Sequence, residues 1–138
     1  MRWHFHRIGR SAVALAIAWL VLAAAPALAD PAKFAVLRTL DKVTARVATA
    51  TVAVGDGFTM GTLSVTVRAC DKRPPEEPPE SAAFLEIVEN QPDEPPVARF
   101  TGWMFASSPA LSALEHPIYD VWVIDCVNEA TTEGGTSP

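Results

Sequence analysis

The stretch Leu63-Ser64-Val65-Thr66-Val67-Arg68-Ala69-Cys70 carries the clearest indication of the fold class. Apolar and polar side chains alternate from Leu63 to Ala69, and a period of two is typical of a β-strand with one face packed on a core. Cys70 falls on the polar side of this alternation. Either the strand has ended before Cys70 or a β-bulge has shifted its register, and the sequence leaves both interpretations open.

Five other segments rich in apolar or β-branched residues are predicted as strands. They are residues 34–40, 43–54, 82–89, 97–105 and 118–127. The turn Gly55-Asp56-Gly57 and the proline-rich segments 71–80 and 90–96 separate them, because proline fixes φ and removes a backbone donor. Six short strands without long helices between them predict an all-β fold, a small antiparallel β-sandwich or barrel. The number of strands does not distinguish the two.

One short helix is predicted between the last two strands. Ser107-Ser108-Pro109 is typical of a helix start, since serine caps free amide groups and proline suits the first helical position. Pro117 then ends the helix after His116, which predicts about two turns on an edge or end of the sheet. Gly102, inside the strand at 97–105, predicts a bulge or a close backbone approach.

Residues 1–29 have the three-part layout of a secretory signal peptide. Three arginines precede an apolar run at residues 12–25, and Ala27-Leu28-Ala29 places small residues at a cleavage site. The apolar run is shorter than the roughly 17–25 residues of a membrane-spanning helix. We therefore expect cleavage after Ala29 and a periplasmic product without a stable membrane span.

Cleavage leaves 109 of the 138 residues, a length suited to one domain. We expect a β-rich domain at residues 30–127 and a disordered tail at 128–138, because the tail has no apolar anchor. The mature part holds eight Lys and Arg against sixteen Asp and Glu, a net charge of −8. This charge disfavours nucleic acid and anionic membrane surfaces as partners.

Cys70 and Cys126 are the two cysteines of the chain, and both lie in the mature part. An even number of cysteines in a small exported domain predicts a disulfide. A zinc site is the alternative, but these cysteines are 56 positions apart and His116 is the one mature histidine, so close ligand pairs are missing. We predict a Cys70–Cys126 disulfide worth roughly 4 kcal/mol on the chain-entropy model, with no metal site and no cofactor.

His116 is the residue to consider first for catalysis, because imidazole titrates near neutral pH. No serine in the mature part lies in the context of an activated nucleophile, so we predict no catalytic residue. Carboxylate pairs for glycoside hydrolysis or calcium binding are expected by chance among sixteen acidic residues. We predict Glu86, Asp120 and Asp125 on solvated strand faces instead.

The segment 102–123 holds more large apolar and aromatic side chains than one strand face and a short helix readily bury. At least one of Trp103, Tyr119 and Trp122 is therefore predicted to stay partly exposed as a binding residue. Along the last strand, Trp122 shares its parity with Cys126, whereas Tyr119 shares the other with Val121. This places Trp122 in the core and makes Tyr119 or Trp103 the contact residue.

Three blocks of the sequence resemble one bacterial family. They are TLDKVTARV at 39–47, VRAC at 67–70 with the following segment 71–81, and the final block 100–126. Together they resemble an uncharacterised family of exported alphaproteobacterial proteins, domain of unknown function 2155. The resemblance implies a Gram-negative periplasmic setting and supplies no activity, cofactor or catalytic residue.

Two functions are compatible with these features. The first is a non-enzymatic periplasmic binding or envelope-assembly module, with a protein or peptidoglycan as partner. The alternative is a small periplasmic hydrolase acting on cell-wall material. An enzyme needs a concave site that gathers His116 with a carboxylate or serine, whereas a binding module needs an exposed aromatic or apolar patch.

Overall fold

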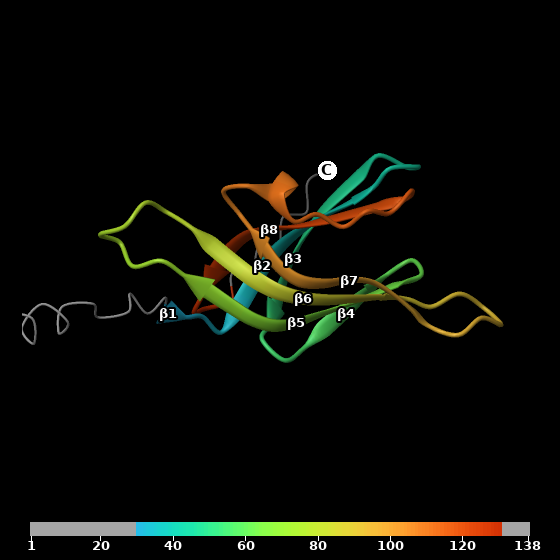
Figure 1. The fold of residues 1–138 in the computed structure, drawn as a ribbon, viewed down its shortest axis with the longest axis horizontal. Helices are drawn as coiled ribbons and strands as arrows, with labels where there is room; N and C mark the ends of the chain where they lie inside the picture. Colours follow the sequence, from blue (N-terminus) through green and yellow to red (C-terminus); the bar gives the residue numbers. More distant parts are fainter. Residues whose placement is uncertain (1–29, 131–138) are drawn as a thin grey trace, which may run out of the picture.

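A computed structural model describes residues 30–130, which form two antiparallel sheets (Figure 1). The elements are β1 (Asp30–Pro31), β2 (Phe34–Asp41), β3 (Arg46–Ala53), β4 (Gly57–Met60), β5 (Leu63–Lys72), β6 (Ser81–Glu89), β7 (Val97–Phe105), the 3-10 turn η1 (Pro109–Leu111) and β8 (Tyr119–Val127). The predicted signal peptide at 1–29 lies outside the described residues, as does 131–138 of the predicted tail. The all-β prediction is confirmed.

The larger sheet has the strand order β1-β5-β6-β7, and the smaller has the order β3-β2-β8. β6 pairs with the full length of β5, so β1 and β4 share the other side of β5. The two sheets pack against each other as a β-sandwich. The proline-rich segments 73–80 and 90–96 connect β5 to β6 and β6 to β7, and they project from opposite ends of the larger sheet (Figure 1). β5 therefore extends two residues into the segment 71–80 that was predicted as a loop.

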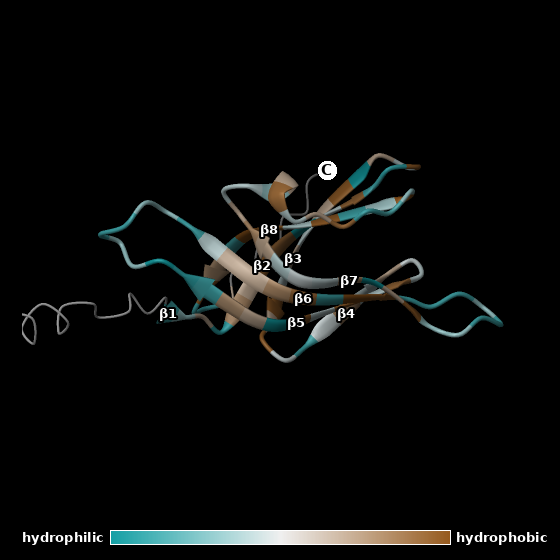
Figure 2. Ribbon diagram, viewed as in Figure 1, coloured by the Kyte–Doolittle hydropathy of each residue, from teal (hydrophilic) through white to brown (hydrophobic). Residues whose placement is uncertain are grey.

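The core lies between the two sheets, where alternate side chains of both inner faces meet. Its largest fully buried side chains include Leu37 and Val123 from the smaller sheet and Leu63, Leu85 and Ile87 from the larger one. Hydrophilic residues dominate the projecting loops, and hydrophobic ones gather in the strands (Figure 2). None of the described residues forms a helix with the length and apolar character of a bilayer crossing.

The predicted disulfide is confirmed and joins the two sheets. Cys70 on β5 and Cys126 on β8 are both buried, and their Cα atoms are 5.7 Å apart. A β-bulge explains how Cys70 reaches the core: Val67 pairs with Leu85 and Ala69 with Phe84, which leaves Arg68 without a partner. The extra residue reverses the parity of the strand. Of the two interpretations that the sequence left open, the bulge is the correct one.

A second bulge, in β8, overturns the predicted placement of Trp122. Val123 pairs with Leu37 and Asp125 with Val36, so Ile124 is the extra residue. Val121 and Val123 therefore face the core before the bulge and Cys126 faces it afterwards. Trp122 lies on the outer face, and its assignment to the core side with Cys126 was wrong.

Strand β7 also contains a bulge, at a different residue from the predicted one. Ile87 pairs with Phe100 and Val88 with Ala98, which makes Arg99 the extra residue. Gly102 instead pairs regularly with Leu85. Of the two alternatives predicted for Gly102, the bulge is wrong. The close backbone approach is not found either, because the atoms nearest to a Cβ at Gly102 belong to the Phe100 side chain.

The predicted two-turn helix up to His116 is also wrong. Only the three residues of η1 are helical in this segment, and the Ser108 side chain makes no capping hydrogen bond. Leu111 is 74% exposed whereas Leu114 is 5% exposed, although these two side chains would share one face of a helix. Burial of Leu114 and His116 draws the segment into an extended path, because tertiary contacts outweigh weak local propensity.

Candidate functional site

The three predicted contact residues lie in three separate parts of the molecule. Trp103 is on the outer face of the larger sheet and Trp122 on the outer face of the smaller one. Tyr119 lies at the start of β8, partly buried against the core. The prediction that at least one of the three stays partly exposed is confirmed, but they do not form one surface.

Tyr119 belongs to a buried polar cluster that the sequence did not predict. Its ring stacks on the His116 ring, with centroids 5.3 Å apart and planes at 21°. The His116 Nε2 atom lies 3.2 Å from Glu89 Oε1 at the end of β6. Glu89 and His116 are both buried, and Lys42 Nζ donates to the His116 carbonyl at 2.8 Å. The cluster therefore ties the loop before β8 to both sheets.

Both ring nitrogens of His116 are engaged within the fold. Nδ1 accepts hydrogen bonds from the backbone N–H groups of Ile118 and Tyr119, each at 3.1 Å. A nitrogen that accepts from two donors carries no proton, so Nε2 is the protonated nitrogen and donates to Glu89. Neither nitrogen is placed to take a proton from a substrate. This geometry gives His116 a structural role, and its lack of a catalytic role stays a prediction.

Glu89 is the acceptor at the centre of this cluster. Besides His116, it accepts from Arg99 Nη2 at 2.5 Å and Nε at 2.6 Å, and from Thr62 Oγ1 at 3.2 Å. The hydrogen bonds from His116 and then Arg99 lower the pKa of Glu89 from 4.5 to about 2. These contacts join the β4–β5 turn, the end of β6 and the start of β7. No local motif could have indicated them, since His116 and Glu89 are 27 positions apart.

The pKa of Glu89 predicts how acid affects a Glu89→Gln variant. A lowered pKa in the folded state stabilises the fold above the unfolded-state pKa of about 4.5, and this contribution disappears as the pH falls toward 2. We expect the variant to be less stable than the wild type at pH 7, and the difference to shrink between pH 5 and pH 2. Urea unfolding at each pH measures it. A difference that stays constant over this range would contradict the assignment.

The other carboxylates considered from the sequence each contact a cation. Glu86 pairs with Arg68 at 2.9 Å and Asp120 with Lys42 at 3.1 Å, both between partly exposed side chains. They lie on accessible strand positions, as predicted. Within residues 30–130, no group of three or more His, Cys, Asp or Glu side chains is placed to hold a metal ion.

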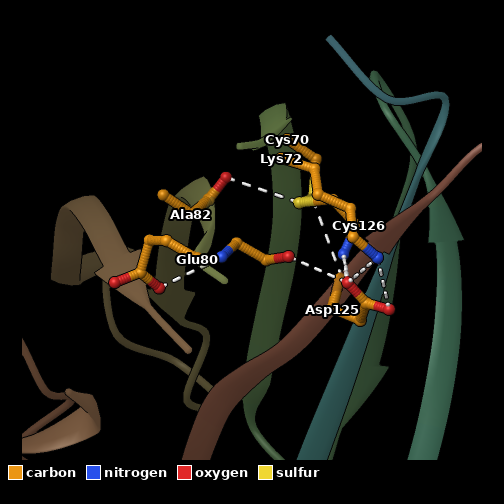
Figure 3. Close-up of polar contacts among 7 residues, drawn as sticks. Cys70, Lys72, Glu80, Ala82, Asp125 and Cys126 are labelled. Atoms are coloured by element: carbon orange, nitrogen blue, oxygen red, sulfur yellow. Dashed lines mark hydrogen bonds and ion pairs between the residues drawn. A yellow bond between two sulfur atoms is a disulfide. The ribbon is translucent and has the colours of Figure 1, made fainter. Parts of the chain in front are cut away.

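Asp125 organises the contacts beside the disulfide (Figure 3). It accepts from Lys72 Nζ, Ser81 Oγ and the Cys126 N–H, each at 2.8 Å. Burial raises the pKa of Asp125, but the hydrogen bonds from Lys72 and Ser81 outweigh it and leave the pKa below its ordinary value. Asp125 therefore fastens β8 to β5 and β6 around the buried Cys70–Cys126 bond.

An open cavity of about 350 Å³ lies near the same end of the molecule. Its lining includes Asp30, Lys72, Arg73 and Asn128, from the ends of β1, β5 and β8. His116, Glu89 and the three predicted aromatic residues do not line it. The cavity therefore does not gather the groups that an acid–base mechanism needs.

The most exposed aromatic surface surrounds Trp103. We call Phe84, Trp103 and Phe105 the aromatic patch: all three lie on the outer face of β6 and β7. Phe84 and Trp103 meet edge to face, with centroids 5.6 Å apart and planes at 82°. The Trp103 side chain is 37% exposed. Since β7 is the last strand in the order of its sheet, the patch lies beside a strand edge.

The fold and its surfaces define a class of small all-β domains with one disulfide between two antiparallel sheets. The chain belongs to the family DUF2155, described as uncharacterized protein conserved in bacteria, whose family model matches residues 35–126. It is 32% identical over 87 residues to an uncharacterised protein of Rickettsia prowazekii (strain Madrid E). That match covers 63% of this chain and 56% of the Rickettsia protein. No solved structure matches the chain.

Proposed function

We propose that this protein is a non-enzymatic binding module of the bacterial periplasm and cell envelope, which captures a protein partner through the aromatic patch. The observation that carries the proposal is the exposure of Trp103 beside a strand edge. Tryptophan is among the residues most often found at the centre of protein interfaces. Its contact with Phe84 holds the indole in place, so little side-chain entropy is lost on binding.

The strand edge indicates the form of the partner. β7 pairs with β6 on one side, and five of its nine residues are exposed, including Val97 and Trp103. An extended segment of another protein can add to such an edge, where its backbone supplies hydrogen bonds and the aromatic patch supplies selectivity. The alternative of a hydrolase acting on cell-wall material gains no support, because both His116 nitrogens are occupied and Glu86 and Asp120 are paired with cations.

A photo-reactive amino acid at Thr101, an exposed position on the patch side of β7, tests the proposal in cells of the source bacterium. Once the cross-linked protein is identified and purified, Trp103→Ala should weaken its binding by about 2 kcal/mol, roughly thirty-fold. Calorimetric titration measures this change. Val97→Ala, a 42% exposed position on the same strand, is the matched control and should change the affinity less than about three-fold.

Thermal unfolding of each variant shows that the fold is retained. Equal affinities for wild type and Trp103→Ala, with both proteins folded, would contradict the proposal. Trp103-dependent co-sedimentation with purified peptidoglycan, without a cross-linked protein, would show that the partner is a glycan instead.

The proposed localisation has its own test. Because Ala27-Leu28-Ala29 fits signal peptidase and no cysteine follows closely to accept a lipid, the mature protein should begin at Asp30. Intact-mass measurement on the protein recovered from a periplasmic fraction gives its first residue. A mass that retains residues 1–29 would mean that the apolar segment stays attached.

A further inference from the structure

A second surface lies on the opposite side of the sandwich, on the outer face of the smaller sheet. Positions 34, 36, 38 and 40 of β2 point away from the core, since Ala35, Leu37 and Thr39 between them are buried. Arg38 is on the central strand, and its partners in register are Thr49 on β3 and Trp122 on β8. We call this surface the Arg38 face. It consists of Phe34, Val36, Arg38, Leu40, Val47, Thr49 and Trp122.

Most side chains around Arg38 on this face are apolar, apart from Thr49 on β3 and from Asp120 at the border, which is paired with Lys42. Among the described residues no third layer covers the face. Phe34, Val36, Leu40 and Trp122 are each partly exposed, and Val47 is 56% exposed. Within residues 30–130 the only other element, η1, packs on β7 of the other sheet. An uncovered sheet face with a tryptophan beside its central strand and apolar neighbours has a composition found in interface cores.

The positive charge of Arg38 indicates the charge of a partner that would cover this face. Five of the eight Lys and Arg among the described residues form ion pairs, and the three that do not are Lys33, Arg38 and Arg46. Of these three, Arg38 lies on the central strand, between Val36 and Leu40 and beside Trp122. Burying an arginine without a counter-ion is unfavourable, whereas a guanidinium between apolar side chains binds a carboxylate strongly and with defined geometry.

The charge of Arg38 also argues against a second copy of this chain as the partner on the Arg38 face. A two-fold axis through the central strand would bring two Arg38 guanidinium groups close together between apolar surfaces. A membrane surface also fits poorly, because the face offers one unpaired cation and the mature chain has a net charge of −8. A protein segment with one acidic residue among apolar ones satisfies both the charge and the apolar surroundings.

We infer that the Arg38 face docks a second protein partner, through an Asp or Glu of that partner set among apolar side chains. This interaction is additional to the one proposed for the aromatic patch. The two surfaces lie on the outer faces of different sheets, so both partners can be bound at once. The protein would then connect two components of the cell envelope.

The test begins with a photo-reactive amino acid at Thr49, which is exposed and adjacent to Arg38 in the register of the sheet. Mass spectrometry identifies the cross-linked protein and the segment attached. With that protein purified, Arg38→Glu should weaken binding about thirty-fold or more, and replacing the partner's carboxylate by lysine should restore affinity to Arg38→Glu. Arg46→Glu, the same charge change at an exposed position opposite Asp41 in the strand register, should change affinity less than about three-fold.

Three outcomes would overturn the inference. The first is cross-linking at Thr49 only to another copy of this chain, to a muropeptide or to nothing. The second is equal weakening by Arg38→Glu and Arg46→Glu, which would indicate a general charge effect. The third is failure of the reciprocal charge exchange to restore binding. Trp103→Ala should leave this affinity within about two-fold, so failure of the aromatic patch and failure of the Arg38 face are distinguishable.

Discussion

Replacing both Cys70 and Cys126 by alanine is expected to lower the free energy of unfolding by about 4 kcal/mol. The bond closes a loop of 56 positions and joins β5 to β8, so it limits the unfolded chain and fastens the two sheets. This loss is large beside the total stability of about 5–15 kcal/mol that is usual for a single domain. Both residues are replaced together, so that no free thiol is left to form intermolecular bonds.

Urea unfolding at pH 7 measures the difference, with the reduced wild-type protein as a second form of the same change. The alanine variant and the reduced wild type should both unfold at a lower urea concentration than the oxidised wild type. Their free energies of unfolding should depend on urea concentration to a similar extent. A Cys70→Ala, Cys126→Ala protein that loses less than about 1 kcal/mol would show that the sheets are held together without the bond. The fold would then tolerate a reducing environment.

His116→Ala is expected to lower the free energy of unfolding by about 3 kcal/mol. The substitution removes the hydrogen bond to Glu89 and the stacking on Tyr119, and it leaves two backbone N–H groups at the start of β8 without their acceptor. Buried donors without partners account for much of the effect. Glu115→Ala, at the exposed neighbouring position, is the matched control and should change stability by less than about 0.5 kcal/mol.

Measuring both stability and cellular function of His116→Ala distinguishes a structural role for His116 from a catalytic one. A double-mutant cycle with Glu89→Gln should show strong coupling in stability, because the two side chains share one hydrogen bond. If His116→Ala instead keeps its melting temperature but loses its function in cells, the buried cluster is not structural and the hydrolase alternative returns. A loss of function in proportion to the loss of stability is the expected result.

The two proposed docking surfaces are both connected to this cluster through neighbouring residues of the same strands. The aromatic patch lies on β6 and β7, whose ends meet at Glu89 and Arg99. The Arg38 face includes Trp122, three residues after the Tyr119 ring that stacks on His116. Variants of the cluster should therefore weaken both interactions together, whereas Trp103→Ala and Arg38→Glu each weaken one.

The local features of the fold can be predicted from the residues and their near neighbours. Alternation at Leu63–Ala69 follows from the period of a strand, and the prolines within 73–80 and 90–96 prevent helix or central strand there whatever surrounds them. Two cysteines in a small chain that is predicted to be exported were enough to predict the bond between them. Each of these inferences depends on the residue and its near neighbours, which a single sequence displays directly.

The tertiary structure decided which face of each strand is buried and which residues meet. A single extra residue at Arg68, Ile124 or Arg99 reverses the parity of everything beyond it, and nothing local in the sequence indicates where the insertion falls. For this reason the alternation along β8 predicted Trp122 in the core, whereas it lies on the outer face of the smaller sheet. The contact between His116 and Glu89, and the extended path of the segment before β8, arise because packing across the sandwich outweighs weak local helix propensity.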